Sequence, residues 1–487
     1  MSLSSTASAP GPARRVAAAL VAALMVSCSG LALAQETPLT AESRRSLTLT
    51  VYNQNLGLVS ETRRVDLPAG ESLLAIGDVS GQMQPETVLL SAPGLRVVEQ
   101  SLDANLLTPG RLLEASVGQT VQIIRQHPET GADIVEEARV LSMAGGLVVQ
   151  IGDRVEIDPP GRIAFTSLPA GLRSEPTLLA RVFPGQAGPN DLRLDYLTGG
   201  LSWRADYVAR LNAAADRLDL AALVTLTNGT DSDFAGATLR LVAGEVNQAA
   251  PVFAQPKAFN ARAEMAAMAP MPADDVSAPV AAADRYVYGV ERPVTLRRGE
   301  TKQIPLMSAE GVKVAREYRF EGVVNGHPGV EETGPVNAAL MLELANDPDL
   351  GLGAPLPAGT VRVYGPAPAA AGGGATLFLG ADRLEHTPEG EKARLNLGEA
   401  FDVTARAEST VYERLSDRVY EIGQKITVKN AKDEAVEVVL AGVMPRGWTL
   451  RDASAPPTQE SATRVSWRLT VPAGGETELT YRIRVSN

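Results

Sequence analysis

The sequence predicts an all-β protein built from several antiparallel β-sandwich or barrel domains, with an N-terminal signal peptide and a C-terminal immunoglobulin-like sandwich. Three observations predict this class. From Leu47 onward, apolar and polar residues alternate with a period of two in one segment after another, as in half-buried strands. The 487 residues include 44 Gly and 33 Pro, which supply turns between short elements. No long stretch has the period of an amphipathic helix, which excludes βαβ architectures and their phosphate-binding sites.

Residues 1–34 have the pattern of a signal peptide. Two arginines precede the apolar run 16–26, and small residues then lead to Ala32 and Ala34. We expect cleavage between Ala34 and Gln35, and therefore an exported protein that is periplasmic or associated with the cell envelope.

Cys28 is the single cysteine of the chain, and it ends the segment 25–28, an imperfect lipoprotein-type cleavage box. A lipid on this cysteine would hold the protein on a membrane. With ordinary cleavage Cys28 leaves with the signal peptide, and we expect no membrane contact. One cysteine also excludes a disulfide framework and cysteine-rich zinc sites.

The first half of the mature chain divides into an N-terminal β-domain over residues 35–109 and a small unit over residues 110–170. The close spacing of short strands in the small unit indicates either a small barrel or an inserted β-sheet. In chain order the alternation predicts strands at Leu47–Tyr52, Leu58–Val65, Ser72–Ile76, Thr87–Leu90, Leu95–Gln100, Val117–Arg125, Ala138–Ser142, Leu147–Ile151, Arg154–Ile157 and Arg162–Phe165.

A central β-sandwich domain is predicted over residues 171–410, with a flexible excursion rich in Ala, Pro and Met at 250–283. Its inward face includes Trp203, and we expect all three tryptophans to pack in cores rather than to stack on sugars. The predicted strands are Asp191–Tyr196, Ser202–Leu211, Leu218–Asn228, Ala237–Glu245, Tyr286–Val290, Val294–Leu296, Lys302–Leu306, Lys313–Phe320 and Val336–Leu344.

The last predicted domain, residues 411–487, has the size and strand spacing of a separate immunoglobulin-like sandwich. Its predicted strands are Val419–Val428, Ala435–Leu440, Trp448–Leu450, Arg464–Val471 and Glu476–Val485.

Several motifs in order along the mature chain carry a resemblance to a known family. They include the segments 200–207, 224–228, 241–247, 351–364 and 384–390. These segments resemble the bacterial domain-of-unknown-function 4139 (DUF4139) family, whose C-terminal domain is shared with mucoidy-inhibitor-like proteins. The resemblance implies an exported, β-rich protein. It brings no activity and no catalytic residue.

The segment 382–389 holds the most concentrated set of chemistry-bearing side chains. Asp382, Glu385, His386 and Glu389 have the residue types of a metal site or an acid/base pair. No second histidine is nearby, so a locally hydrogen-bonded loop is the favoured interpretation.

Two further features have both a functional and a plain interpretation. The turn at 228–233 offers carboxylate and amide oxygens to calcium, or it is a solvated hairpin turn. Arg204, Asp206 and Arg210 alternate with Trp203 and lie on the opposite face of their strand, which is either a solvated face or a binding strip.

Together these observations predict an exported, non-catalytic protein that binds or scaffolds an envelope protein or polysaccharide. We expect no cofactor, no metal, no catalytic residue and, at a net charge of −12, no nucleic-acid partner. The alternatives are an envelope hydrolase that uses scattered carboxylates such as Asp206, Asp382 and Glu385, or a calcium- or ligand-binding β-module.

Overall fold

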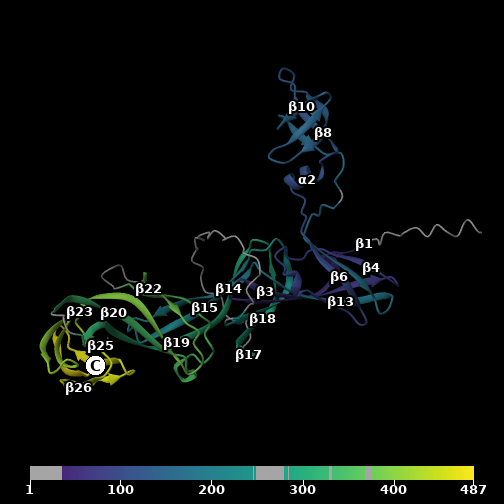
Figure 1. Cartoon of the computed structure of the whole chain (residues 1–487). Coiled ribbons are helices and arrows are strands. Elements are labelled where there is room, and N and C mark those ends of the chain that lie inside the picture. The colour runs from purple at the N-terminus through teal and green to yellow at the C-terminus, as the bar shows by residue number, and fades with distance from the viewer. Residues whose placement is uncertain are drawn as a thin grey trace, which may run out of the picture. The chain divides into compact units, whose positions relative to one another are not determined.

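The computed structural model confirms the all-β class (Figure 1). Strands β1–β29 dominate the part of the chain that the structure describes, and its one α-helix is the seven-residue α2 (Pro109–Ala115). None of the helices there is long and apolar enough to cross a membrane. The described residues are 36–169, 171–244, 246–247, 279–282, 285–327, 332–367 and 375–486.

Two sequence predictions fall largely outside these residues. The signal peptide lies outside them, together with its cleavage residues Ala32, Ala34 and Gln35 and with Cys28. Of the excursion predicted at 250–283, only residues 279–282 are described, and they contain the short strand β17 (Val280–Ala282).

The chain divides into two compact units. Unit 1 holds residues up to Ser46 and Ser60–Tyr196, and unit 2 holds Leu47–Val59 and Leu197–Asn487. The segment 47–59, predicted as part of an N-terminal domain, therefore belongs to the same unit as the C-terminal half of the chain. Within unit 2 its strand β2 (Arg44–Tyr52) pairs in parallel with β16 (Phe234–Ala243).

Unit 1 contains a four-stranded sheet in which strands far apart in sequence are neighbours. Its core positions include Leu74, Ile76, Leu178 and Val182, which are fully buried. The order of this sheet is β1 (Glu36–Leu39), β4 (Ser72–Ile76), β12 (Thr177–Phe183) and β6 (Arg96–Asp103). A second sheet contains β3 (Leu56–Leu67), β5 (Leu89–Ser91) and β13 (Gly188–Thr198).

A five-stranded antiparallel sheet is inserted between the paired strands β6 and β12. Val121, Ile123, Val140 and Val149 form its core, and Leu113 of α2 packs against them. Among the described residues, its outermost strands do not pair with each other, so the sheet is open. Of the two predicted alternatives, this arrangement is the inserted β-sheet and not the small barrel. The order is β10 (Arg154–Ile157), β9 (Val148–Ile151), β8 (Asp133–Ser142), β7 (Thr120–Gln126) and β11 (Arg162–Ala164).

Two long strands organise unit 2 (Figure 1). β19 (Thr301–Asn325) pairs first with β15 (Arg217–Asn228) and then, over its second half, with β20 (Glu332–Ala345) and β25 (Val436–Val443). β23 (Lys392–Arg414) pairs with β20 and then with β24 (Val419–Asn430). Apolar and polar residues alternate through both halves of β19. The strands predicted at Lys302–Leu306 and Lys313–Phe320 are therefore parts of one long strand.

β15 and the first half of β19 belong to one sheet of unit 2. In this part of the sheet, the face that the sequence predicted to point inward is buried. Trp203 and Tyr207 lie inward on β14 (Leu201–Leu211), where the Trp203 indole donates a hydrogen bond to the carbonyl of Val242 at 3.1 Å. β18 (Arg285–Leu296) joins the two strands predicted at Tyr286–Val290 and Val294–Leu296 into one. β21 (Gly359–Pro366) and β22 (Thr376–Leu384) were not predicted, because Gly and Pro bound them closely.

The C-terminal half is a sandwich in which β25 and β28 (Arg464–Val471) pack across from β24 and β29 (Glu476–Ser486). At its centre, Trp467 stacks on Tyr481 with ring centroids 5.1 Å apart. The core also contains Tyr318, Phe320 and Val403, which precede the boundary predicted at 411. The edge strands are β26 (Trp448–Ala453) and β27 (Thr458–Gln459).

The parallel pairing of β19 with β25 depends on Gly442. A Cβ atom there would lie 2.0 Å from the carbonyl oxygen of Val324, closer than any real contact. We predict that Gly442→Ala lowers the free energy of unfolding by about 1–3 kcal/mol, because one strand must shift. Denaturant unfolding measures this. Gly334→Ala, where a Cβ meets no atom within 4 Å, is the matched control and should be nearly neutral.

Candidate functional site

The four residues singled out at 382–389 lie at the end of β22 and in the loop that follows. The Asp382 carboxylate accepts backbone N–H groups from Asn396 at 2.6 Å and Arg383 at 2.8 Å. Glu385 forms an exposed ion pair with Arg383 at 3.2 Å. The Nδ1 atom of His386 accepts a hydrogen bond from the backbone N–H of Ala358 at 3.1 Å.

Glu389, the fourth of these residues, is exposed. No three His, Cys, Asp or Glu side chains form a group able to hold a metal ion in the described part of the chain. The structure therefore gives these four side chains local hydrogen-bonding and surface positions.

The oxygens of the turn at 228–233 are also used locally. The Asn228 side-chain oxygen accepts hydrogen bonds from the backbone N–H and the hydroxyl of Thr230, at 3.0 and 2.6 Å. Asp233 accepts the backbone N–H of Arg298 at 2.8 Å. These bonds close the turn and hold it against the turn that contains Arg298.

Ionisable groups are concentrated elsewhere, around four buried carboxylates that each pair with at least two arginines. The first is Glu61, on an inward position of β3 in unit 1. Its oxygens meet Arg44 at 2.6 Å and Arg63 at 2.8 Å, and Arg63 also donates to the carbonyl of Leu39 at 2.8 Å. Nearby, burial raises the pKa of the Tyr196 hydroxyl well above its usual value.

Asp206 is the second, and it was one of the carboxylates considered for a hydrolase. It lies 3.1 Å from Arg204 on its own strand and 3.1 Å from Arg362 on β21. The hydroxyl of Thr225, on β15, donates to it at 2.7 Å. Asp206 therefore links three neighbouring strands.

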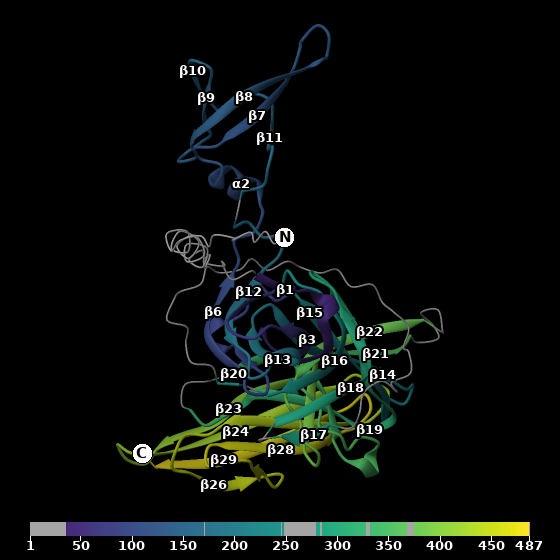
Figure 2. The same cartoon turned by 90° about the vertical axis from the view of Figure 1, so that its right-hand side faces the viewer.

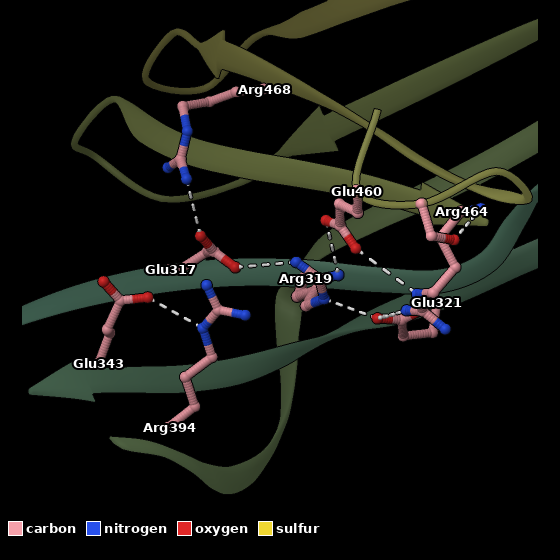
Figure 3. A network of polar contacts seen from close by, with 9 residues as sticks. Glu317, Arg319, Glu321, Glu343, Arg394, Glu460, Arg464 and Arg468 are labelled. Carbon is pink, nitrogen blue, oxygen red and sulfur yellow. Dashed lines mark hydrogen bonds and ion pairs between the residues drawn. The ribbon is translucent and has the colours of Figure 1, made fainter. Parts of the chain in front are cut away.

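The third carboxylate, Glu317 on β19, lies in a larger network (Figure 3). Arg319 approaches it at 3.4 Å, and Arg468 reaches it from β28 at 3.1 Å. Farther along β19, Glu321 pairs with Arg319 at 2.6 Å and with Arg464 of β28 at 3.0 Å. Because β25 lies between β19 and β28 in the sheet, these pairs span it.

The fourth carboxylate is Glu421 on β24. Arg484 and Arg482 of β29 lie 2.7 and 2.6 Å from its oxygens. Hydrogen bonding to Arg484, and then the charge of Arg482, lower the pKa of Glu421 below its ordinary value.

These four sites have a common chemical consequence. A general acid, base or nucleophile needs a carboxylate oxygen directed at a substrate. Here the carboxylate oxygens meet guanidinium groups of the protein itself, and each acid is buried. The arrangement joins strands across the sheets and neutralises buried charge.

A different surface remains open, where β14, β21 and β22 lie side by side (Figure 2). A hollow of about 330 Å³ lies at the ends of these strands. It is lined by Arg210, Leu211, Asn212, Ala213, Tyr364, Gly365, Pro366, Ala375 and Thr376.

Arg210, Tyr364 and Phe378 form one row across the three strands, since they are cross-strand partners. The rings of Tyr364 and Phe378 pack together with centroids 5.5 Å apart. The guanidinium of Arg210 makes no ion pair with any residue that the structure describes, in contrast to the arginines around the buried acids. The row thus places Arg210 on the strand next to Tyr364, with Phe378 one strand farther along.

The sequence pointed to only part of this surface. Arg210 belongs to the charged face opposite Trp203, which was predicted as either a solvated face or a binding strip. Tyr364 and Phe378 were missed because β21 and β22 were not predicted. The run Leu377-Phe378-Leu379, apolar yet exposed, is the signal that identifies the surface once its strand is known.

The fold defines an all-β protein of sandwich and barrel-like sheets. The sequence model of a domain of unknown function, DUF4139, matches residues 192–487. The chain belongs to this family. No curated protein matches the sequence.

The lowered pKa of Glu421 predicts a pH dependence of stability. The pKa of Glu421 in the folded protein lies below the ordinary 4.5. Glu421 therefore contributes fully to the free energy of unfolding above about pH 4.5, and this contribution is lost as the pH falls through the folded-state pKa. Glu421→Gln should therefore lower the Tm at neutral pH and make the fall in Tm on acidification shallower. Calorimetry over a pH series measures both effects.

Asp417→Asn is the matched control, because Asp417 is exposed and pairs only with Arg414, at 3.0 Å. It should leave the pH profile unchanged. If the Tm of Glu421→Gln fell with decreasing pH in parallel with that of the wild-type protein, the lowered pKa of Glu421 would be contradicted.

Proposed function

We propose that this chain is an exported, non-catalytic protein of the cell envelope that binds or scaffolds a partner through the hollow containing Arg210. The observation that carries the proposal is that Arg210, which makes no ion pair with any residue that the structure describes, lines this hollow together with Tyr364, whose ring packs against Phe378 on the next strand. The four buried carboxylates support the non-catalytic part, because arginines surround them.

The chemistry of the hollow indicates what the partner presents. A guanidinium group binds a carboxylate through two parallel hydrogen bonds, and the Tyr364 ring supplies a flat apolar wall next to it. The small residues Ala213, Gly365 and Ala375 leave room between them. A carboxylate attached to a sugar ring or to an apolar side chain fits these requirements.

The overall charge affects selectivity as well. At −12 the chain repels acidic partners in general, so attraction must come from local cations such as Arg210. An acidic envelope polysaccharide or an acidic segment of an envelope protein meets both conditions. In either case binding should weaken at high salt.

The proposal predicts that charge reversal at Arg210 abolishes partner capture. A tagged wild-type protein, crosslinked in its native envelope, should recover a small and reproducible set of partners by mass spectrometry. Arg210→Glu should reduce their recovery about tenfold or more, because a charge-assisted hydrogen bond is worth about 1.5–3 kcal/mol and the new charge repels the carboxylate.

Arg45→Glu is the matched control: it makes the same charge change at an exposed arginine of unit 1 and should leave recovery unchanged. Competition with soluble polygalacturonate or polyglutamate distinguishes a sugar acid from an acidic peptide. Equal recovery by the wild-type protein and Arg210→Glu, or recovery of the bait alone, would contradict the proposal.

A further inference from the structure

The inserted five-stranded sheet and α2 of unit 1 form a module, residues 109–165, that has a core of its own. The buried apolar cluster around Ile123 and Val149 includes no residue from the rest of the described chain. Among the described residues, the hydrogen bonds and ion pairs of the module also stay within residues 108–165. Parts of a chain that share no large apolar interface move relative to each other unless their connection is fixed.

The connection is a neck of two short segments. Residues 104–108 follow β6, and residues 171–176 precede β12. The segments bind each other through their backbones: the N–H of Leu107 donates to the carbonyl of Arg173 at 2.7 Å, and the N–H of Arg173 donates to the carbonyl of Asn105 at 3.0 Å. Arg173 is therefore the residue at which the two segments of the neck meet.

The side chain of Arg173 ties this meeting point to the four-stranded sheet. Its Nε atom donates to Asp103 at 2.8 Å, and its two Nη atoms donate to the two oxygens of Glu36 at 3.1 and 3.0 Å. Glu36 begins β1 and Asp103 ends β6, the strands at the two ends of the sheet order. The Arg173 side chain is only 22% exposed, so water screens these contacts less than those of a surface ion pair. One guanidinium group thus fixes the neck to both of these strands.

We propose that the neck is a hinge and that Arg173 is its latch. A closed latch makes the module and the four-stranded sheet move as one body. When the contacts of Arg173 break, the module turns about residues 104–108 and 171–176, since hinges are a few residues at the ends of elements that absorb changes in backbone angles. The hinge belongs to unit 1 and the hollow containing Arg210 to unit 2, so this inference goes beyond the proposed function and does not depend on it.

Hydrogen–deuterium exchange of the full chain tests the latch. Arg173→Met keeps the apolar stem of the side chain and removes its charge. Peptides that cover the neck should then exchange about tenfold faster or more, because charge-assisted hydrogen bonds no longer protect the backbone there. Peptides around Ile76 in the four-stranded sheet and around Ile123 in the module should exchange as in the wild-type chain, which shows that both remain folded.

A distance measurement tests the movement. Spin labels on Val155→Cys in the module and Val98→Cys on β6, in a Cys28→Ser background, report the distance between the two parts; Val155 and Val98 are exposed. The distance distribution should be narrow with Arg173 in place and several-fold broader with Arg173→Met.

Arg181→Met is the matched control. Arg181 lies on β12 and also pairs with two acids, Glu71 and Glu99, but it is not part of the neck. This variant loses the same number of ion-pair partners from the same sheet. It should leave the exchange of the neck and the narrow distance distribution unchanged.

Neck exchange in Arg173→Met equal to that of the wild-type chain would overturn the proposal, as would a distance distribution equally broad with and without Arg173. A neck loosened as much by Arg181→Met, or faster exchange around Ile76 in Arg173→Met, would overturn it too, because Arg173 would then only support the sheet. Partner capture through Arg210 is a separate measurement, and its failure would contradict the proposed function and leave this inference standing.

Discussion

The pairing of each buried carboxylate with arginines constrains how the neighbouring strands align, and much of the structure follows from this constraint. Glu61, Asp206, Glu317 and Glu421 are all buried, and all are held in this way. Taking such charges out of water is costly, and the cost is offset only when the charges meet in good geometry. Removing one partner would leave a buried charge unpaired. The registers of the strands that carry these residues are thereby tied to one another.

This arrangement explains how the surface is divided. In the Glu317 network of Figure 3, cations and anions balance. The surface around Arg210 differs, because Arg210 makes no ion pair with the residues that the structure describes and no other charged side chain lines its hollow. The proposed binding surface therefore lies at the end of one sheet, apart from the buried ionic groups.

The sequence predicted strands well where alternation was strong, as in β14 and β24, since burial of one face dictates a period of two. It could not show that β19 is one strand through both halves of unit 2, or that residues 47–59 join that unit, because strand pairing is non-local. The candidate residues around His386 were chosen by type alone, and their neighbours in space supply backbone N–H groups instead of further ligands. Arg210 was visible as a charge, but its freedom from ion pairs depends on contacts that no local pattern contains.

The central claim is that the buried carboxylates serve the fold and that the open surface serves binding. Its most direct test is partner capture by a variant in which one buried carboxylate and its two arginines are replaced by apolar residues of similar size, Glu317→Leu with Arg319→Met and Arg468→Met. Such replacements are often neutral for stability. The account predicts a folded protein, by circular dichroism, that recovers the same partners as the wild-type chain. A folded variant that has lost its partners would contradict it.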